Sequence, residues 1–157
     1  MRYQPTRYRQ VREILDWIQV FHEALSIEYQ NMANGPVRER VALLLQYLAD
    51  HQRTVKATIK HFEEDADTQV LNTWHDHFPE LDLPDNLHDL KSHLSTISTN
   101  DVVRLALQFH DLLIHLYEEI RNSAPTDEVK DVFDNLALME SREKERMLRD
   151  ANMLEDI

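Results

Sequence analysis

The sequence contains no cysteine, and it has only one glycine and five prolines among its 157 residues. Without cysteine, the chain has no thiol catalysis, no thiolate metal ligands and no disulfide bonds. Scarce glycine and proline leave few residues for the tight turns of a multi-stranded sheet, whereas residues that favour helices are plentiful. We therefore expect an all-α protein that forms a single domain over residues 1–157.

Positive charge is also scarce, because 17 Lys and Arg residues stand against 29 Asp and Glu, for a formal net charge of −12 at pH 7. This balance argues against binding to nucleic acid or to anionic membranes, since both interactions rely on basic side chains. No apolar run reaches the roughly 20 residues that span a bilayer, and residues 1–12 contain no signal-peptide core. We expect a soluble, cytoplasmic protein that binds neither nucleic acid nor a membrane.

An internal repeat is the clearest pattern that the sequence does contain. Phe109–Tyr117 is a near copy of Phe21–Tyr29, with a histidine second in each copy. The same spacing recurs for two Leu-Ala pairs, because 110 − 22, 117 − 29 and 136 − 48 all equal 88. The repeat predicts one helical hairpin that is used twice.

Apolar residues recur at helical spacing in four long segments. We expect helices from about residue 6 to 33, from 36 to 63, from 100 or 101 to 123, and from 126 to near the C-terminus. Asn34-Gly35-Pro36 and Ala124-Pro125-Thr126 provide the turns within the two hairpins. Residues of about 65–99 form a long crossover that should contain one or two short helices. The expected fold is a ferritin-like four-helix bundle of two hairpins joined by this crossover.

The inward stripe of each predicted helix turns polar near its middle. The polar positions are His22, Gln52, His110, Glu140 and Glu143. Since an unpaired buried carboxylate is costly, these side chains should form one cluster in which the carboxylates pair, become protonated or bind a metal. His51 lies off the stripe and receives no role, and His75 is placed in a polar loop of the crossover.

Two segments resemble rubrerythrin-type ferritin-like proteins. Leu136–Glu143 resembles their fourth-helix signature, in which Leu-Ala leads into Glu-x-x-His, and Ala106–Tyr117 resembles their third-helix signature, in which a Glu precedes a Tyr by seven residues. The resemblance implies a bundle with a di-iron or related di-metal centre. In that centre, helices 1 and 3 each supply one Glu, and helices 2 and 4 each supply a Glu-x-x-His pair.

Carried over position by position, the resemblance gives a degenerate ligand set. His22 and His110 stand in place of the two single Glu ligands, Gln52 and Val55 in place of the helix-2 pair, and Glu140 and Glu143 in place of the helix-4 pair. Only Glu140 matches the family residue type. Val55 cannot bind a metal, and Gln52 is at best a weak neutral ligand.

Three states of this cluster stay open at the sequence level. Protonated His22 and His110 can hydrogen-bond to Glu140 and Glu143 in a metal-free network that sets the helix register. The same four residues, with Gln52 as a weaker donor, can instead hold one Fe(II), Mn(II) or Zn(II) ion. The third state is a two-metal centre.

We favour a non-enzymatic ferritin-like scaffold or interaction protein, with a homodimer or another protein as partner. The missing ligands support this hypothesis, and so do apolar residues in excess of one stripe late in the last helix, namely Met147, Leu148, Met153 and Leu154. The alternative is a metal-binding oxidoreductase or metal-handling protein that uses the inner His/Glu cluster. A small-molecule pocket lined by Trp17, Tyr47 and the two histidines is a third hypothesis.

Overall fold

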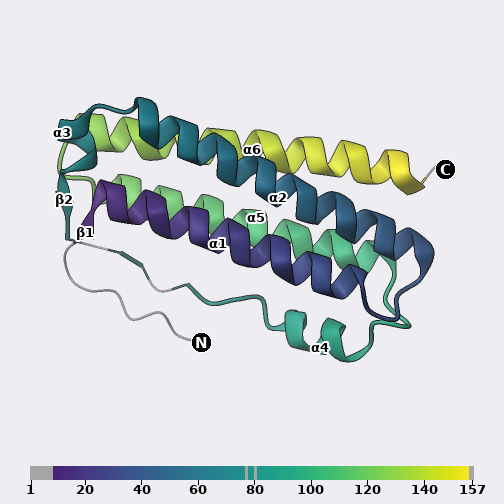
Figure 1. Cartoon of the computed structure of the whole chain (residues 1–157). Coiled ribbons are helices and arrows are strands. Elements are labelled where there is room, and N and C mark those ends of the chain that lie inside the picture. The colour runs from purple at the N-terminus through teal and green to yellow at the C-terminus, as the bar shows by residue number, and fades with distance from the viewer. Residues whose placement is uncertain (1–8, 77, 80, 156–157) are drawn as a thin grey trace.

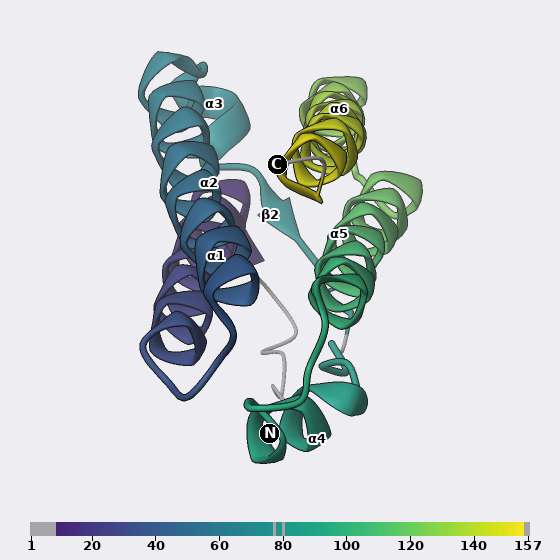
Figure 2. The ribbon, with the colours of Figure 1, turned by 90° about the vertical axis from the view of Figure 1, so that its right-hand side faces the viewer.

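Four long helices make up the body of the computed structural model, which describes residues 9–76, 78–79 and 81–155 (Figure 1). They are α1 (Val11–Ala33), α2 (Glu39–Asp65), α5 (Thr99–Asn122) and α6 (Asp127–Glu155). α1 packs with α2 in one antiparallel hairpin and α5 with α6 in a second, and the hairpins stand next to each other (Figure 2). This arrangement confirms the predicted all-α bundle of two hairpins.

The crossover runs the length of the bundle and contains α3 (Thr68–Leu71), β2 (Trp74–His75) and α4 (Asn86–Ser92). The short helices agree with the prediction. An antiparallel ladder between β2 and β1 (Arg9–Gln10) was not predicted, because two-residue strands leave no periodic pattern in a sequence. None of the helices in the described ranges is long and apolar enough to cross a membrane.

Two helices begin later than their sequence patterns predict. α1 starts at Val11 rather than near Thr6, which lies outside the described residues. The preceding Arg9 and Gln10 are extended because they pair with β2, and the Val11 amide donates to the Thr73 carbonyl at 3.0 Å. α2 starts at Glu39 rather than at residue 36. Its first residues are preceded by a turn in which the Gly35 amide donates to the carbonyl of residue 32 at 3.1 Å.

α5 begins one residue earlier than expected, because Ser98 supplies its N-cap. The Ser98 hydroxyl accepts from the Asp101 amide at 3.1 Å, and the Asp101 carboxylate accepts from the Ser98 amide at 2.9 Å. This reciprocal arrangement is a capping box. The hydrogen bond from the Ser98 amide is the main reason that the pKa of Asp101 is lowered.

The apolar core is divided into two clusters, one toward each end of the bundle. One cluster includes Ile14, Ile18, Val55, Ile59, Leu113, Ile120 and Phe133. The other includes Leu25, Met32, Leu45, Leu48, Leu105, Phe109 and Met147. The residues between them on each helix are the polar positions of the inward stripes. The bundle centre is therefore a polar layer between two apolar cores.

The apolar residues late in α6 are mostly taken up by the protein's own core. Met147 is fully buried, and Leu148 and Leu154 pack partly buried against the second cluster. Only Met153 among them is largely exposed. These residues therefore give little support to a partner surface on this part of α6.

Candidate functional site

The first histidine of the central layer, His22 on α1, is paired with Gln52 on α2. Both side chains are buried, and His22 Nδ1 lies 2.5 Å from the amide oxygen of Gln52. Because that oxygen can only accept, Nδ1 carries the proton and donates. Burial lowers the pKa of His22, outweighing the nearby Glu140 carboxylate and the Gln52 hydrogen bond, which act to raise it. His22 is therefore a neutral imidazole whose Nε2 presents a lone pair.

The second histidine, His110 on α5, is paired in the same way with Glu140 on α6. Both side chains are buried, and His110 Nδ1 lies 2.9 Å from Oε1 of Glu140. The histidine nitrogen donates and the carboxylate oxygen accepts. Glu140 is the only acidic residue that is fully buried among the described residues. The bundle centre thus contains a single carboxylate in its interior.

The two pairs occupy equivalent positions of the internal repeat. Each joins residues 30 positions apart, and each uses Nδ1 of the histidine. The spacing of the two acceptors, 140 − 52, is also 88. The repeat therefore extends from the histidines to their hydrogen-bond partners, with a neutral amide in the first hairpin and a carboxylate in the second.

Glu143, the remaining predicted member, lies at the edge of this layer and contacts a histidine that sequence reasoning left out. Its Oε2 is 3.3 Å from Nε2 of His51 on α2. Although Glu143 is close, burial and the neighbouring His110 dominate and lower the pKa of His51 to about 4. The rings of His51 and His110 have centroids 6.2 Å apart. The sequence contains one indication that His51 could reach the layer, because His51 directly precedes an inward-facing polar residue.

Two tyrosines, Tyr29 and Tyr117, are buried beside the layer at equivalent positions of the repeat. Burial, followed by the charge of Glu140, raises the pKa of both phenols. The Tyr117 hydroxyl makes no hydrogen bond within the described part of the chain. Both side chains pack as core residues.

His75 lies inside the protein and not in a polar surface loop, so that expectation was wrong. Its side chain is buried, and Nε2 lies 3.1 Å from the carbonyl oxygen of Ile120. Nε2 therefore donates to the last turn of α5. The physical reason is the β1–β2 ladder, which holds this part of the crossover against the bundle end. His77 lies outside the described residues.

The central layer does not fit a di-metal carboxylate centre. Two divalent ions need several carboxylates to balance their charge, and such centres draw Glu residues from all four helices. Here Glu140 is the one buried carboxylate, while Gln52 is neutral and Val55 is apolar. Within the described ranges, no three His, Asp or Glu side chains are grouped so that they could hold a metal ion.

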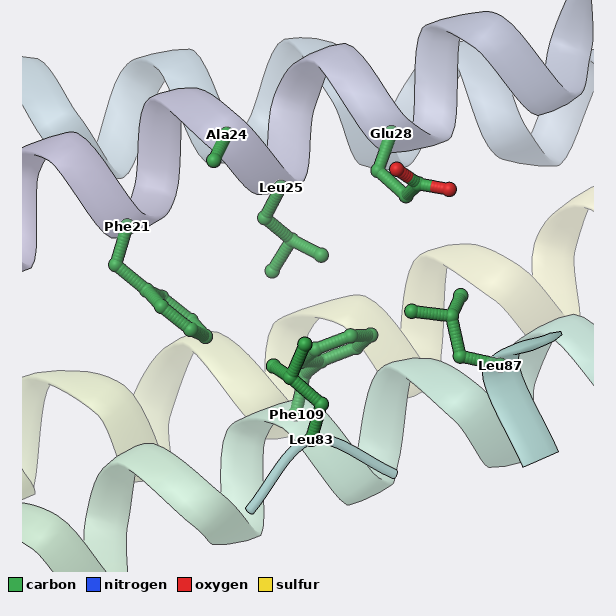
Figure 3. Close-up of a pocket in the computed structure, with 7 residues that line it drawn as sticks. All are labelled: Phe21, Ala24, Leu25, Glu28, Leu83, Leu87 and Phe109. Carbon is green, nitrogen blue, oxygen red and sulfur yellow. The ribbon is translucent and has the colours of Figure 1, made fainter. Parts of the chain in front are cut away.

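A mainly apolar hollow lies on the other side of α1, under the crossover (Figure 3). Its volume is about 200 Å³. It is lined by Phe21, Ala24, Leu25 and Glu28 on α1, Phe109 on α5, and Leu83 and Leu87 of the crossover. The suggested pocket between Trp17, Tyr47 and the two histidines is not this one. Trp17 instead packs edge-on against Phe78, with ring centroids 5.0 Å apart.

Comparisons with known proteins point to the fold. No protein-family profile and no curated protein sequence matches the chain. A solved structure from Thermotoga maritima, assigned as a candidate ferritin-like diiron-carboxylate protein, does match. The match has a TM-score of 0.61, covers 94% of this chain and 98% of the other, and has 13% sequence identity. Identity at this level supports the fold alone. The chain has the ferritin-like four-helix bundle fold.

Proposed function

We propose that this ferritin-like bundle is a non-enzymatic scaffold or interaction protein, with a hydrogen-bonded polar layer at the position that a metal centre would occupy. One observation carries the proposal. Each inward histidine is bound through Nδ1 to an acceptor of its own hairpin, Gln52 for His22 and Glu140 for His110. One acceptor is neutral, so the layer lacks the negative charge that two metal ions require.

The layer is suited to holding the four helices in register. His22 and Gln52 join α1 to α2, and His110 and Glu140 join α5 to α6. His51 Nε2 and Glu143 Oε2 lie 3.3 Å apart between α2 and α6, a contact between the hairpins in which His51 Nε2 makes no hydrogen bond to the residues that the structure describes. A helix that slipped by one turn would place these polar groups against apolar core, where each unpaired group costs about 1–3 kcal/mol. The layer therefore favours one arrangement of the hairpins.

A second candidate function is supported by two lone-pair atoms in the same layer. His22 Nε2 and Glu140 Oε2 are buried and make no hydrogen bond within the described residues. Buried acceptors without donors are suited to an ion or a water molecule. One Fe, Mn or Zn ion bound at these two atoms would supply Lewis-acid or redox chemistry, and the protein would then be a metal-handling protein or an oxidoreductase.

Metal content and thermal stability separate the two candidates. The protein is purified without chelator and analysed for metals, and its melting temperature is then measured with Fe(II), Mn(II) or Zn(II). If the protein is a metal-free scaffold, we expect less than about 0.2 ion per chain and an unchanged melting temperature. About one ion per chain, together with a rise in melting temperature that is lost in Glu140→Gln, would instead support the metal-binding protein.

A further inference from the structure

The hollow between α1, α5 and the crossover has mainly apolar walls that come from both hairpins (Figure 3). Phe21 and Leu25 belong to α1, Phe109 to α5, and Leu83 and Leu87 to the crossover. Phe21 and Phe109 hold equivalent positions of the internal repeat, since 109 − 21 is 88. Their ring centroids are 6.3 Å apart, and the ring planes are tilted by 62°. Each copy of the repeat thus contributes one aromatic ring to the hollow.

The hollow has an entrance, because some of its lining residues are exposed and others are buried. Ala24 on α1 is exposed, and Leu83 of the crossover is 45% exposed. Leu25 and Phe109 are only 5% and 3% exposed. A ligand that packs against Leu83 removes part of its apolar surface from water, which favours binding. The apolar interior is therefore accessible without a change of fold.

The volume of the hollow matches a molecule with a single ring. A cavity of about 150 Å³ lined by Leu, Ile and Phe side chains stays dry and binds benzene. The hollow here has a volume of about 200 Å³ and the same kinds of side chain, so it accommodates one ring with a small substituent. Sites for drug-sized ligands and cofactors occupy roughly 300–1,000 Å³. Larger ligands of that kind do not fit.

One polar side chain, Glu28, is among the residues that line the hollow. Figure 3 shows Glu28 and Leu87 toward one end of the hollow and Phe21 toward the other. Lys91 Nζ on α4 lies 2.6 Å from Oε1 of Glu28, so the charge of the carboxylate is already balanced. A carboxylate has about four lone-pair positions on its two oxygens, so Glu28 can accept a further hydrogen bond while it is bound to Lys91. The hollow therefore offers an acceptor but no net charge.

We propose that this hollow binds a small neutral molecule with one aromatic ring and one hydroxyl group, of the phenol class. The ring packs against Phe21, Leu25 and Phe109, and edge-to-face contacts with two phenylalanine rings favour an aromatic ring over an aliphatic one. Because a carboxylate only accepts, the polar group of the ligand is a donor, and its hydroxyl binds Glu28. This site adds ligand binding to the scaffold role and does not depend on the metal state of the central layer.

The charges around the hollow disfavour ionised relatives of such a ligand. A benzoate-type anion would meet the Glu28 carboxylate on a chain with a net charge of −12. A benzylammonium-type cation would have to displace Lys91 from Glu28. A ring without a donor, such as toluene, fills the hollow but gives Glu28 no further hydrogen bond. The expected order of affinity is therefore phenol, then toluene, then the two ions.

Titration of the full chain at pH 7 with these four probes tests the proposal. Isothermal calorimetry should show saturable binding of phenol at one site, with a Kd of about 1 mM or lower. Toluene should bind several-fold more weakly, and benzoate and benzylammonium at least tenfold more weakly. Nuclear Overhauser effects from the phenol ring should reach the methyl groups of Leu25 and Leu87, which line the hollow.

Two pairs of variants separate binding in the hollow from binding elsewhere. Ala24→Phe places a ring at the entrance and should weaken phenol binding at least tenfold. Ala57→Phe, at an exposed alanine on α2, is the matched control and should bind phenol like the original chain. Because both alanines are exposed, both variants should keep the helical circular dichroism. Glu28→Met should remove the preference for phenol over toluene, whereas Glu28→Gln keeps an acceptor oxygen and should retain it.

The absence of saturable phenol binding up to about 10 mM would overturn the proposal. So would phenol binding that survives Ala24→Phe, or binding of benzoate or benzylammonium as tight as that of phenol. A preference for phenol that persists in Glu28→Met would contradict the role of the carboxylate and overturn the assigned ligand class.

Discussion

Gln52 and Glu140 hold equivalent positions in the two hairpins, and each accepts a hydrogen bond from a histidine 30 residues earlier, at 2.5 Å and 2.9 Å respectively. The two acceptors have the same length and nearly the same shape. They differ in charge, so one half of the layer is neutral and the other contains the buried carboxylate. Exchanging one acceptor for the other therefore tests whether the layer depends on hydrogen bonding or on charge.

Replacing Glu140 should show that the acceptor matters more than the charge. Glu140→Gln keeps an oxygen for His110 Nδ1 and gives the second hairpin the amide of the first, so the free energy of unfolding should change by less than about 1 kcal/mol. Glu140→Leu leaves the buried His110 donor unpaired and should cost about 1–3 kcal/mol. Urea denaturation at pH 7 measures both. Equal losses in the two variants would contradict a role based on hydrogen bonding.

Stability should fall as the pH is lowered from 6.5 toward 4, because of His51. Burial lowers its pKa to about 4, from 6.5 for an unperturbed histidine. The unfolded chain therefore binds more protons between these values, and the free energy of unfolding decreases with falling pH. His51 alone should remove about 2 kcal/mol between pH 7 and pH 5. His22, whose pKa is also lowered by burial, acts in the same direction.

The matched comparison for this pH dependence is His51→Gln, measured by urea denaturation at several pH values. The net charge of the chain affects the variant and the original protein almost equally, so the difference between them isolates the histidine. The variant should lose less stability between pH 7 and pH 5. Identical slopes would show that His51 does not titrate as its burial requires.

Removal of the Tyr117 hydroxyl should stabilise the protein. The hydroxyl is buried and has no hydrogen-bond partner within the described residues, so burying it costs free energy that phenylalanine does not lose. Tyr117→Phe should raise the free energy of unfolding by about 1 kcal/mol. Thermal and urea denaturation would measure the change. A loss of similar size would mean that the hydroxyl is bound by something in the layer.

The capping box of α5 should contribute measurably to stability. Ser98→Ala removes the hydroxyl that accepts from the Asp101 amide and should cost about 1 kcal/mol. Ser95→Ala, in the exposed turn just before the helix, is the control and should have almost no effect. Hydrogen exchange should also become faster at the amides of the first turn of α5. Equal stability of the two variants would contradict the assigned cap.

The main architecture was predictable because it depends on strong periodic patterns. The stripe of α1 from Ile14 to Met32 is buried along its length, and the inward polar positions His22, Gln52, His110 and Glu140 are all buried together. A helical period places such residues on one face whatever the loops do. The spacing of 88 residues then predicts which positions of the two hairpins correspond.

The parts that were missed depend on contacts between distant segments. His51 was left out because it lies one position from the stripe, where a small rotation of α2 decides between solvent and interior. His75 was misplaced because its burial depends on the pairing of β2 with Arg9 and Gln10, far away in the chain.

The protonation of the His22 ring tests the central claim most directly, because a hydrogen-bonded layer and a metal site use its nitrogens differently. Long-range ¹H–¹⁵N NMR at pH 7 reports both ring nitrogens, with His22→Gln to assign the signals. The account predicts a neutral ring with the proton on Nδ1 and an unprotonated Nε2, and an unchanged spectrum after chelator or one equivalent of Zn(II) is added. A proton on Nε2, or a stoichiometric shift of the Nε2 signal on adding Zn(II), would contradict it.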